Sequence, residues 1–130
     1  MHKEKIIEML NCHNSNNIQQ KGINLALKQK DLDFVMHYSS HPAYAKNCAK
    51  IITSLKYDKS KKYIYDLFVW MESFNNVGAQ EIYEYLKKAP TEVIYNEYVS
   101  AKASAQKRND VDALYILNLF ERERQGIENL

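Results

Sequence analysis

The chain has 130 residues, 45% of them hydrophobic, and a formal net charge of +2, which excludes a disordered polypeptide and fits one domain with a real core. Only three glycines and two prolines argue against a sheet protein, whose many turns need both. The two cysteines form no CxxC pair or secreted disulfide framework, and no apolar run of about 18 residues predicts a membrane span. We therefore expect an all-α protein with free thiols, without a signal peptide and resident in the cytoplasm.

Four helices are predicted in the first 55 residues. The first ends in an Asn-rich loop, and Asn16 or Asn17 is the expected N-cap of the second. Asp31 is the expected N-cap of a short third helix, residues 32–38, and Pro42 stands near the start of the fourth. Apolar residues recur at three- and four-residue steps in these helices, namely at Ile6, Ile7, Leu10, Ile18, Ile23, Ala26, Leu27, Ala45, Cys48, Ile51, Ile52 and Leu55.

A basic connector, residues 57–62, leads to a predicted helical hairpin that ends at Pro90, and Asp58 or Ser60 is the expected cap of its first helix. Trp70, the only tryptophan, lies one step beside the apolar stripe, so it either widens the core or faces a partner. Asparagine and glycine between the two helices supply turn chemistry. The two stripes are Ile64, Leu67, Phe68, Met71 and Phe74, then Ala79, Ile82, Tyr83 and Leu86, around a turn at Asn75, Asn76 and Gly78.

A second hairpin is predicted after Pro90, with Thr91 as the N-cap of its first helix and a turn at residues 108–110. The final helix becomes strongly charged and is expected to end at Gly126, with a frayed tail beyond it. The predicted core positions of this hairpin are Ile94, Tyr98, Ala101 and Ala105, then Ala113, Ile116, Leu117 and Phe120.

The two hairpins pair residues 63–73 with 78–88 and residues 91–107 with 111–125, which indicates a period near 30 residues. Seven or eight helices with short connectors fit a short right-handed HEAT- or armadillo-like stack of antiparallel helix pairs. A four-helix bundle would need fewer and longer helices. We therefore predict one helical-repeat domain over residues 1–130.

The residues with reactive or metal-binding side chains do not form a recognisable catalytic set. His37 and His41 have the four-residue spacing of helical metal ligands, but serines and a proline interrupt the helix there. Cys12 and His13 are adjacent and their side chains diverge, whereas Cys48 lies on an apolar stripe as a small core residue. No phosphate-binding glycine loop or nucleophile elbow occurs. The sequence predicts no enzymatic activity, no cofactor and no metal.

Charge is distributed unevenly along the chain. Residues 1–63 hold 11 lysines and 5 acidic residues, a charge of +6, whereas residues 64–130 hold 7 basic and 11 acidic residues, a charge of −4. The basic part carries lysines interleaved with tyrosines, which could hold phosphates and stack bases, but it contains no arginine to read bases. A solubilising face is the favoured interpretation and a nucleic-acid partner is disfavoured; the residues are Lys46, Lys50, Lys56, Lys59, Lys61 and Lys62 with Tyr44, Tyr57 and Tyr63.

The hairpin LFVWMESFNNVGAQEIYEYL, residues 67–86, resembles a segment of small bacterial HEAT-like proteins. Its features are an apolar helix with a tryptophan, a turn with asparagine and glycine, and a helix start at Ala79 to Ile82. The stretch QKGINLALKQKDL, residues 20–32, also resembles their N-terminal helix. Several proteins of this kind are similar to immunity proteins of contact-dependent growth inhibition and related polymorphic toxin systems.

This resemblance implies a cytoplasmic protein that binds one cognate toxin domain, in a 1:1 complex as a monomer, and blocks its active site or substrate path. Tyrosine and tryptophan provide rigid binding surface at low entropic cost, and the acidic half could face a basic nuclease. A helical-repeat nucleic-acid binder or regulatory adaptor that uses residues 44–63 is the alternative. The candidate partner-binding residues are Trp70, Glu72, Glu81, Glu84, Tyr85, Asp112, Tyr115 and Asn118.

Overall fold

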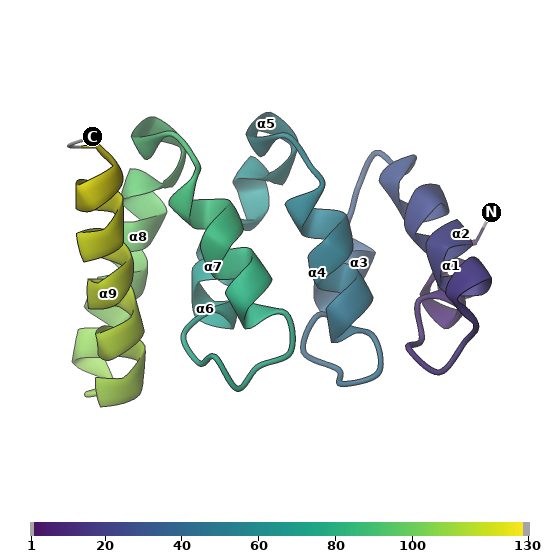
Figure 1. Ribbon diagram of the computed structural model, residues 1–130, viewed down its shortest axis with the longest axis horizontal. Helices are drawn as coiled ribbons and strands as arrows, with labels where there is room; N and C mark the ends of the chain where they lie inside the picture. Colours follow the sequence, from purple (N-terminus) through teal and green to yellow (C-terminus); the bar gives the residue numbers. More distant parts are fainter. Residues whose placement is uncertain (1, 129–130) are drawn as a thin grey trace. The chain divides into compact units, whose positions relative to one another are not determined.

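The computed structural model describes residues 2–128, with side chains from residue 2 to residue 125 (Figure 1). Within these residues all regular structure is helical, which confirms the predicted all-α class. Eight α-helices there have five or more residues, in agreement with the predicted seven or eight. The elements are α1 (Lys3–Met9), α2 (Asn16–Leu27), α3 (Asp33–His37), α4 (Ala45–Thr53), α5 (Tyr57–Ser60), the 3-10 helix η1 (Lys61–Tyr63), α6 (Ile64–Trp70), α7 (Ala79–Lys87), α8 (Thr91–Lys107) and α9 (Val111–Glu128).

The chain divides into two compact units, Met1–Leu55 and Lys56–Leu130, each with its own internal packing. We refer to them as unit 1 and unit 2. The single domain and the right-handed stack predicted for the whole chain stay predictions.

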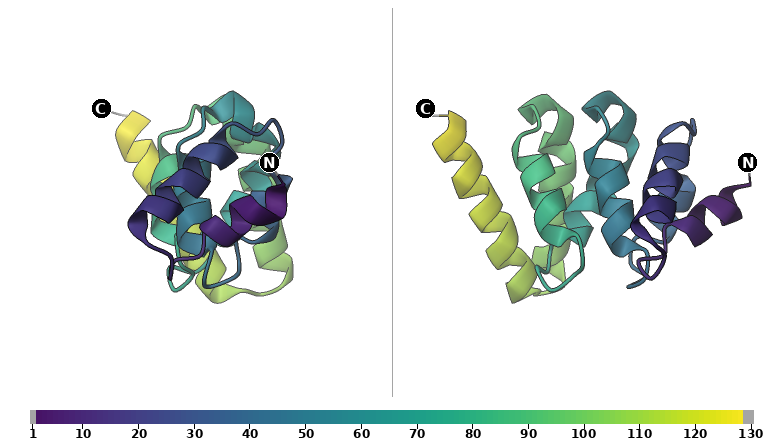
Figure 2. Two further views of the ribbon diagram at one scale, coloured as in Figure 1. Left: turned by 90° about the vertical axis from the view of Figure 1, so that its right-hand side faces the viewer. Right: turned by 45° about the vertical axis from the view of Figure 1, so that its right-hand side comes forward.

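In unit 1, α2 packs against both α1 and α4, and α1 lies at an angle across α2 (Figure 2). The two helices approach most closely at Gly22, where a β-carbon would lie only 2.8 Å from Met9 Cβ and 3.1 Å from Leu10 Cδ2. Glycine is therefore required here by space, although it weakens a helix interior. The predicted core positions Ile6, Ile7, Leu10, Ile23, Ala26, Ala45, Cys48, Ile51, Ile52 and Leu55 are all buried.

Side-chain amides hold the loop between α1 and α2. Asn14 Nδ2 donates to the Glu8 carbonyl at 2.7 Å, which satisfies the free end of α1. Gln19 Nε2 donates to the Asn14 carbonyl at 2.6 Å, and its Oε1 accepts from Asn47 Nδ2 at 2.9 Å. Asn47 also donates to the Leu10 carbonyl at 2.7 Å. This network, buried at Asn47, fixes the loop against α4.

Several local predictions for unit 1 are wrong. The N-cap of α2 is Ser15, whose Oγ accepts from the Ile18 amide, and neither Asn16 nor Asn17 caps it. Ile18, a predicted core residue, is 43% exposed. The Asp31 carboxylate accepts from the Asp33 amide at 2.8 Å, and α3 begins at Asp33, one residue later than a cap at Asp31 implies.

Unit 2 contains two helical hairpins in two layers. Helix α6 contacts α7 and α8, and α9 contacts α7 and α8, so α6 and α8 form one layer behind α7 and α9 in the view of Figure 1. Aromatic rings fill the space between the layers, with Phe120 of α9 against Phe68 of α6, Tyr83 of α7 and Tyr98 of α8 at centroid distances of 5.4, 5.5 and 5.8 Å. The predicted core positions of α8 and α9 are all buried.

The turn between α6 and α7 begins earlier than predicted. Helix α6 ends at Trp70, and Asn76 Nδ2 donates to the Trp70 carbonyl at 3.0 Å, which satisfies that helix end. Phe74 therefore lies in the turn, 37% exposed, with its ring against Tyr83. Gly78 has φ 85°, the left-handed conformation expected from the turn chemistry.

Three further boundaries differ from the predictions. The connector 57–62 is helical, and Ser60 is buried in it as a partner of Tyr85, so neither Ser60 nor Asp58 caps α6. Pro90 is the residue before α8, and Thr91 is its first helical residue. Helix α9 continues through Gly126 to Glu128. Residues 129 and 130 of the predicted frayed tail lie outside the described residues.

We expect Gly22→Ala to destabilise the protein, against the usual effect of replacing a helical glycine. Overpacking against Met9 costs about 1–3 kcal/mol, which exceeds the roughly 1 kcal/mol that alanine contributes to helix propensity. Urea unfolding would measure the difference, with Lys21→Ala on the exposed side of α2 as a control that changes stability by less than about 0.5 kcal/mol. A stabilised Gly22→Ala variant would contradict the close contact.

The two thiols should differ in reactivity. Cys12 is exposed, whereas burial raises the pKa of Cys48 to about 12, so the reactive thiolate is suppressed. We expect a disulfide reagent to modify one thiol rapidly in the native protein and both in denaturant. Cys12→Ser should remove the fast phase, and rapid modification of Cys48 without denaturant would contradict its burial.

Candidate protein-binding surface

Five of the eight predicted partner-binding residues lie on the side of α7 and α9 that faces away from the other layer. Helix α7 buries Ala79, Ile82, Tyr83 and Leu86, and its opposite side presents carboxylates. Helix α9 in the same way buries Phe120 and its stripe and exposes its other side, where Tyr115 is 63% exposed. We call the five exposed residues the α7/α9 face: Glu81, Glu84, Asp112, Tyr115 and Asn118.

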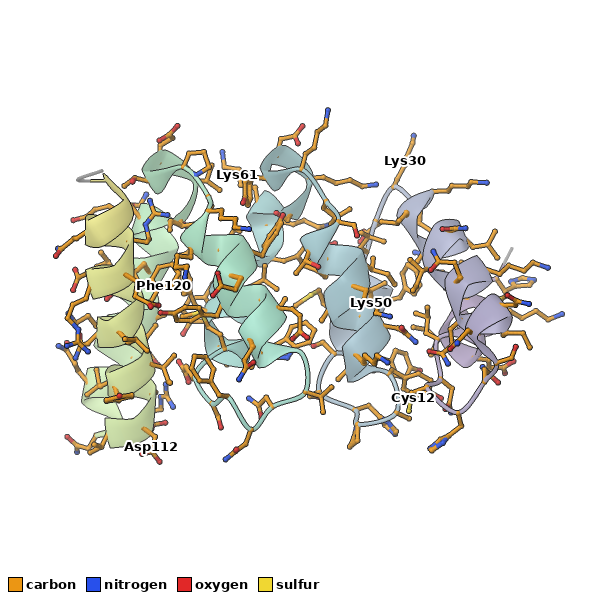
Figure 3. All side chains as sticks on the ribbon, viewed as in Figure 1. Cys12, Lys30, Lys50, Lys61, Asp112 and Phe120 are labelled. Carbon is orange, nitrogen blue, oxygen red and sulfur yellow. The ribbon has the colours of Figure 1, made fainter. Side chains whose placement is uncertain are left out.

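Glu81 and Asp112 lie in the first turns of these two helices. Asp112 lies at the N-terminal end of α9, and Phe120 lies further along between α9 and α7 (Figure 3). Glu81 lies in the first turn of α7, where the helix dipole favours a negative charge. The carboxylates of the α7/α9 face therefore have a structural benefit as well as a potential binding role.

Basic side chains occupy the other end of the α7/α9 face. Lys87 Nζ lies 3.1 Å from Glu84 and 3.8 Å from Glu123, and 5.5 Å from the centre of the Tyr83 ring. The Tyr83 hydroxyl donates to Glu123, and burial together with that carboxylate raises the pKa of Tyr83. Glu84 is therefore partly neutralised, whereas Glu81 and Asp112 stand further from Lys87 along the face.

Trp70 and Tyr85 have structural roles. Trp70 is 8% exposed, and its indole N–H donates to the Val77 carbonyl at 2.8 Å, which supports its place in the core rather than on a binding surface. Tyr85 is 9% exposed, with its hydroxyl 2.7 Å from Ser60 Oγ and its ring 4.8 Å from that of Tyr57. Burial raises the pKa of Tyr85, so its hydroxyl stays neutral. A candidate partner-binding residue on a helix face is expected to be exposed, and this expectation is wrong for Tyr85.

Glu72 joins the two hairpin turns of unit 2. Both of its carboxylate oxygens accept from Arg108 Nη2, at 3.2 and 3.3 Å, and Arg108 Nη1 donates to Asp110 at 3.1 Å. The Glu72 side chain is only 11% exposed. Burial raises its pKa, against the opposing effect of Arg108. Glu72 is thus committed to an internal ion pair and is poorly placed to contact a partner.

The lysines and tyrosines of residues 44–63, considered above as an alternative binding surface, differ in how exposed they are. In unit 2 the four lysines around α5 and η1, Lys56, Lys59, Lys61 and Lys62, are exposed. The tyrosines beside them are engaged: the Tyr57 hydroxyl donates to the Tyr85 carbonyl at 2.9 Å, and Tyr63 is buried under Lys62. These lysines can meet phosphates, but neither tyrosine offers a free ring for base stacking.

A cavity of about 160 Å³ opens between α8 and α9. Its wall is formed by Ile94, Tyr98 and Phe120, and the Tyr98 hydroxyl donates to the Leu117 carbonyl at 2.9 Å. At its rim Arg124 donates to the carbonyls of Lys87 and Ala89, both at 2.7 Å, and so closes the end of α7. The principal polar groups of this cavity hold the protein together and form no nucleophile–base pair.

The histidines and cysteines of the described residues do not converge with carboxylates into a group of three that could hold a metal ion. Within the same residues, no helix combines the length and apolarity needed to cross a bilayer. Comparisons of the chain with protein-family models, with curated proteins and with solved structures give no match.

One feature of unit 2 was missed in the sequence. Four apolar side chains on α6 and α8 are 38–58% exposed: Tyr65, Val69, Tyr95 and Val99. Tyr95 also lines the cavity between α8 and α9. The four residues occupy i and i+4 positions beside the buried stripes. The sequence signal that could have revealed them is this second row of apolar residues beside the buried stripe of each helix.

We expect removal of Arg108 to destabilise the protein in a pH-dependent manner. Arg108→Ala leaves the largely buried Glu72 carboxylate without its cation, at a cost of about 1 kcal/mol because Arg108 itself is partly exposed. A folded-state pKa raised above the ordinary value of 4.5 means that stability is lost as pH rises through it. Arg108→Ala raises that pKa further, so its cost should grow between about pH 4 and pH 7.

Denaturant unfolding at several pH values would measure this effect. Glu72→Gln in the Arg108→Ala background should remove the pH dependence, because the titrating carboxyl is gone. Arg122→Ala, at an exposed position of α9, is the control and should cost less than about 0.5 kcal/mol at either pH. A pH-independent cost for Arg108→Ala would contradict this role of Glu72.

Proposed function

We propose that this chain is a non-enzymatic immunity protein that binds a cognate bacterial toxin domain, a nuclease, and blocks its active site or the path of its substrate. The α7/α9 face carries this proposal, because two adjacent helices present Glu81 and Asp112 beside the exposed ring of Tyr115. Carboxylates spaced along a rigid surface can meet the basic residues with which a nuclease holds phosphates. The family resemblance of residues 67–86 supports the same interpretation.

The expected complex forms in the cytoplasm between one copy of the chain and one toxin domain. Tyr115 supplies an aromatic anchor with few rotatable bonds, and the carboxylates accelerate encounter with a basic partner. The rigid packing of Phe120 and its neighbours holds both helices in place before binding, so little ordering entropy is lost. The role of the protein is steric and electrostatic occupation of the toxin surface.

A nucleic-acid-binding or adaptor function is the alternative, supported by the exposed lysines of α5 and η1. It is disfavoured because Tyr57 and Tyr63 are already engaged within unit 2. Binding of RNA or DNA that falls steeply with added salt, and that is lost on charge reversal of Lys61 and Lys62, would favour it. Toxin binding should survive the same two substitutions.

The decisive experiment co-expresses the chain with the toxin domain encoded directly upstream of its gene. We expect the wild-type chain to restore growth and to form a 1:1 complex. Glu81→Lys/Asp112→Lys should weaken the complex by at least about tenfold, since two attractive contacts become repulsive. Glu92→Lys/Glu97→Lys, on α8, carries the same charge change and should retain rescue.

Circular dichroism and thermal unfolding of both double variants establish that each is folded. Failure of the wild-type chain to bind or rescue would reject the immunity function. Rescue that is lost equally in both variants would reject the α7/α9 face as its site.

A further inference from the structure

The cavity between α8 and α9 has a counterpart in the preceding hairpin of unit 2. We call α6 with α7 the first hairpin and α8 with α9 the second hairpin. The two align by their buried residues, since similar side chains recur at matching positions of α6 and α8 and of α7 and α9. The residues of the cavity wall and their counterparts form three pairs: Ile94 with Ile64, Tyr98 with Phe68, and Phe120 with Leu86.

In the first hairpin this place is covered by the second hairpin. The three counterpart residues are completely buried. The ring of Phe120 lies against Phe68 and Tyr83, at centroid distances of 5.4 and 5.5 Å. One helical turn later, Arg124 donates to two backbone carbonyls at the end of α7. The core of the first hairpin is thus completed by a helix that carries an aromatic ring.

In the second hairpin the same place is open. Among the described residues, unit 2 contains no third hairpin, and α6 and α7 lie on one side of the second hairpin (Figure 1). The cavity has a volume of about 160 Å³, and Tyr95 in its lining is 58% exposed. An apolar cavity of about 150 Å³ is large enough to bind benzene. The cavity therefore has room for one aromatic ring that enters from outside the unit.

The rim of the cavity indicates the direction from which a ring would enter. Glu121 corresponds to Lys87 of the first hairpin, whose ammonium lies 3.8 Å from Glu123 on the covering helix. Glu121 therefore marks the side on which a covering helix would lie. Glu121 contacts Lys102 at 3.6 Å, and Arg124 also lines the rim. Both signs of charge are present there, so the aromatic ring, and not charge, defines the occupant.

We propose that the cavity between α8 and α9 receives a phenylalanine side chain from an amphipathic helix of a partner protein, as the first hairpin receives Phe120. A single ring seated in an apolar pocket is the usual anchor of such a helix. A second folded copy cannot supply the same residue, because its Phe120 is buried. The site contains no residue of the α7/α9 face, so the proposal does not rest on the immunity function.

The chain's own α9 provides a probe, because its phenylalanine already fits the counterpart site. A labelled synthetic peptide with the sequence of residues 111–125 is compared with the same peptide carrying Phe120→Ala. We expect the full-length protein to bind the unchanged peptide, measured by fluorescence anisotropy. Loss of the anchoring ring should weaken binding by at least about tenfold.

A matched pair of tryptophan variants tests whether the peptide enters the cavity. Gln125 is exposed and lines the cavity, so Gln125→Trp places a ring of the protein's own at its mouth. This variant should weaken peptide binding by about tenfold or more. Arg122→Trp adds the same side chain at an exposed position of α9 outside the lining and should change binding by less than about twofold. Cooperative thermal unfolding establishes that both variants are folded.

Four outcomes would overturn the proposal. The wild-type chain could fail to bind the peptide, or bind both peptides equally. Equal binding by the two tryptophan variants would show that the peptide replaces the chain's own α9 and does not enter the cavity. Sedimentation could reveal a wild-type dimer that Gln125→Trp dissociates, which would assign the cavity to a second copy. Toxin rescue with failed peptide binding would reject the docking site alone.

Discussion

The packing of Phe120 is the constraint on which unit 2 depends. Its ring contacts one aromatic ring from each of the other three long elements, Phe68 of α6, Tyr83 of α7 and Tyr98 of α8. A buried aromatic side chain contributes both a large apolar area and a preferred edge-to-face geometry. These contacts add α9 to a core in which α6 and α8 already pack against each other and Glu72 binds Arg108 between the two turns.

The turns of unit 2 are fixed by side chains that reach backbone or charge partners elsewhere in the unit. In the first turn, the Trp70 indole donates to the Val77 carbonyl and Asn76 donates to the Trp70 carbonyl. Glu72 accepts from Arg108 at the second turn. Arg124 satisfies carbonyls at the end of α7. The backbone groups at these helix ends are therefore hydrogen-bonded within unit 2. The residues on the outward sides of the helices are not needed for this purpose and can differ in chemistry.

The periodicity of apolar residues predicted most of the fold. The stripes of α8 and α9 were identified residue by residue, because both helices are long and each core position recurs at helical spacing. Helix ends were harder to place. Ser15, Asn16 and Asn17 are all good N-caps in succession, and only the observed bond to Ile18 distinguishes Ser15.

The candidate surface was predicted less completely, for a physical reason. Glu81, Asp112 and Tyr115 were placed on an exposed face because helical spacing alone separates them from the core. Glu72 and Tyr85 have equally polar or amphipathic side chains, but Arg108 and Ser60 cover them from segments distant in sequence. Such tertiary partners leave no local pattern. Asn47, buried on the apolar stripe of α4, illustrates the same limit in unit 1.

Helices α6 and α8 carry similar residues at positions thirty apart in the sequence. Ile64 and Ile94, Phe68 and Tyr98, and Val69 and Val99 occupy equivalent positions thirty residues apart, so α6 and α8 repeat both their buried and their exposed apolar residues. Burial accounts for the first set, since each stripe must be covered. It does not account for the second, because an exposed tyrosine and valine contribute little to folding.

The α7 and α9 helices share no such exposed repeat. When the buried residues of the two helices are aligned, Ala79 with Ala113 and Leu86 with Phe120, Tyr115 of α9 corresponds to Glu81 of α7, which is not aromatic. The α7/α9 face therefore offers one aromatic anchor among separate carboxylates, whereas α6 and α8 each expose a tyrosine and a valine. Because the aromatic core holds α7 and α9 against α6 and α8, an occupant of the α7/α9 face would bind to a surface whose geometry is already set.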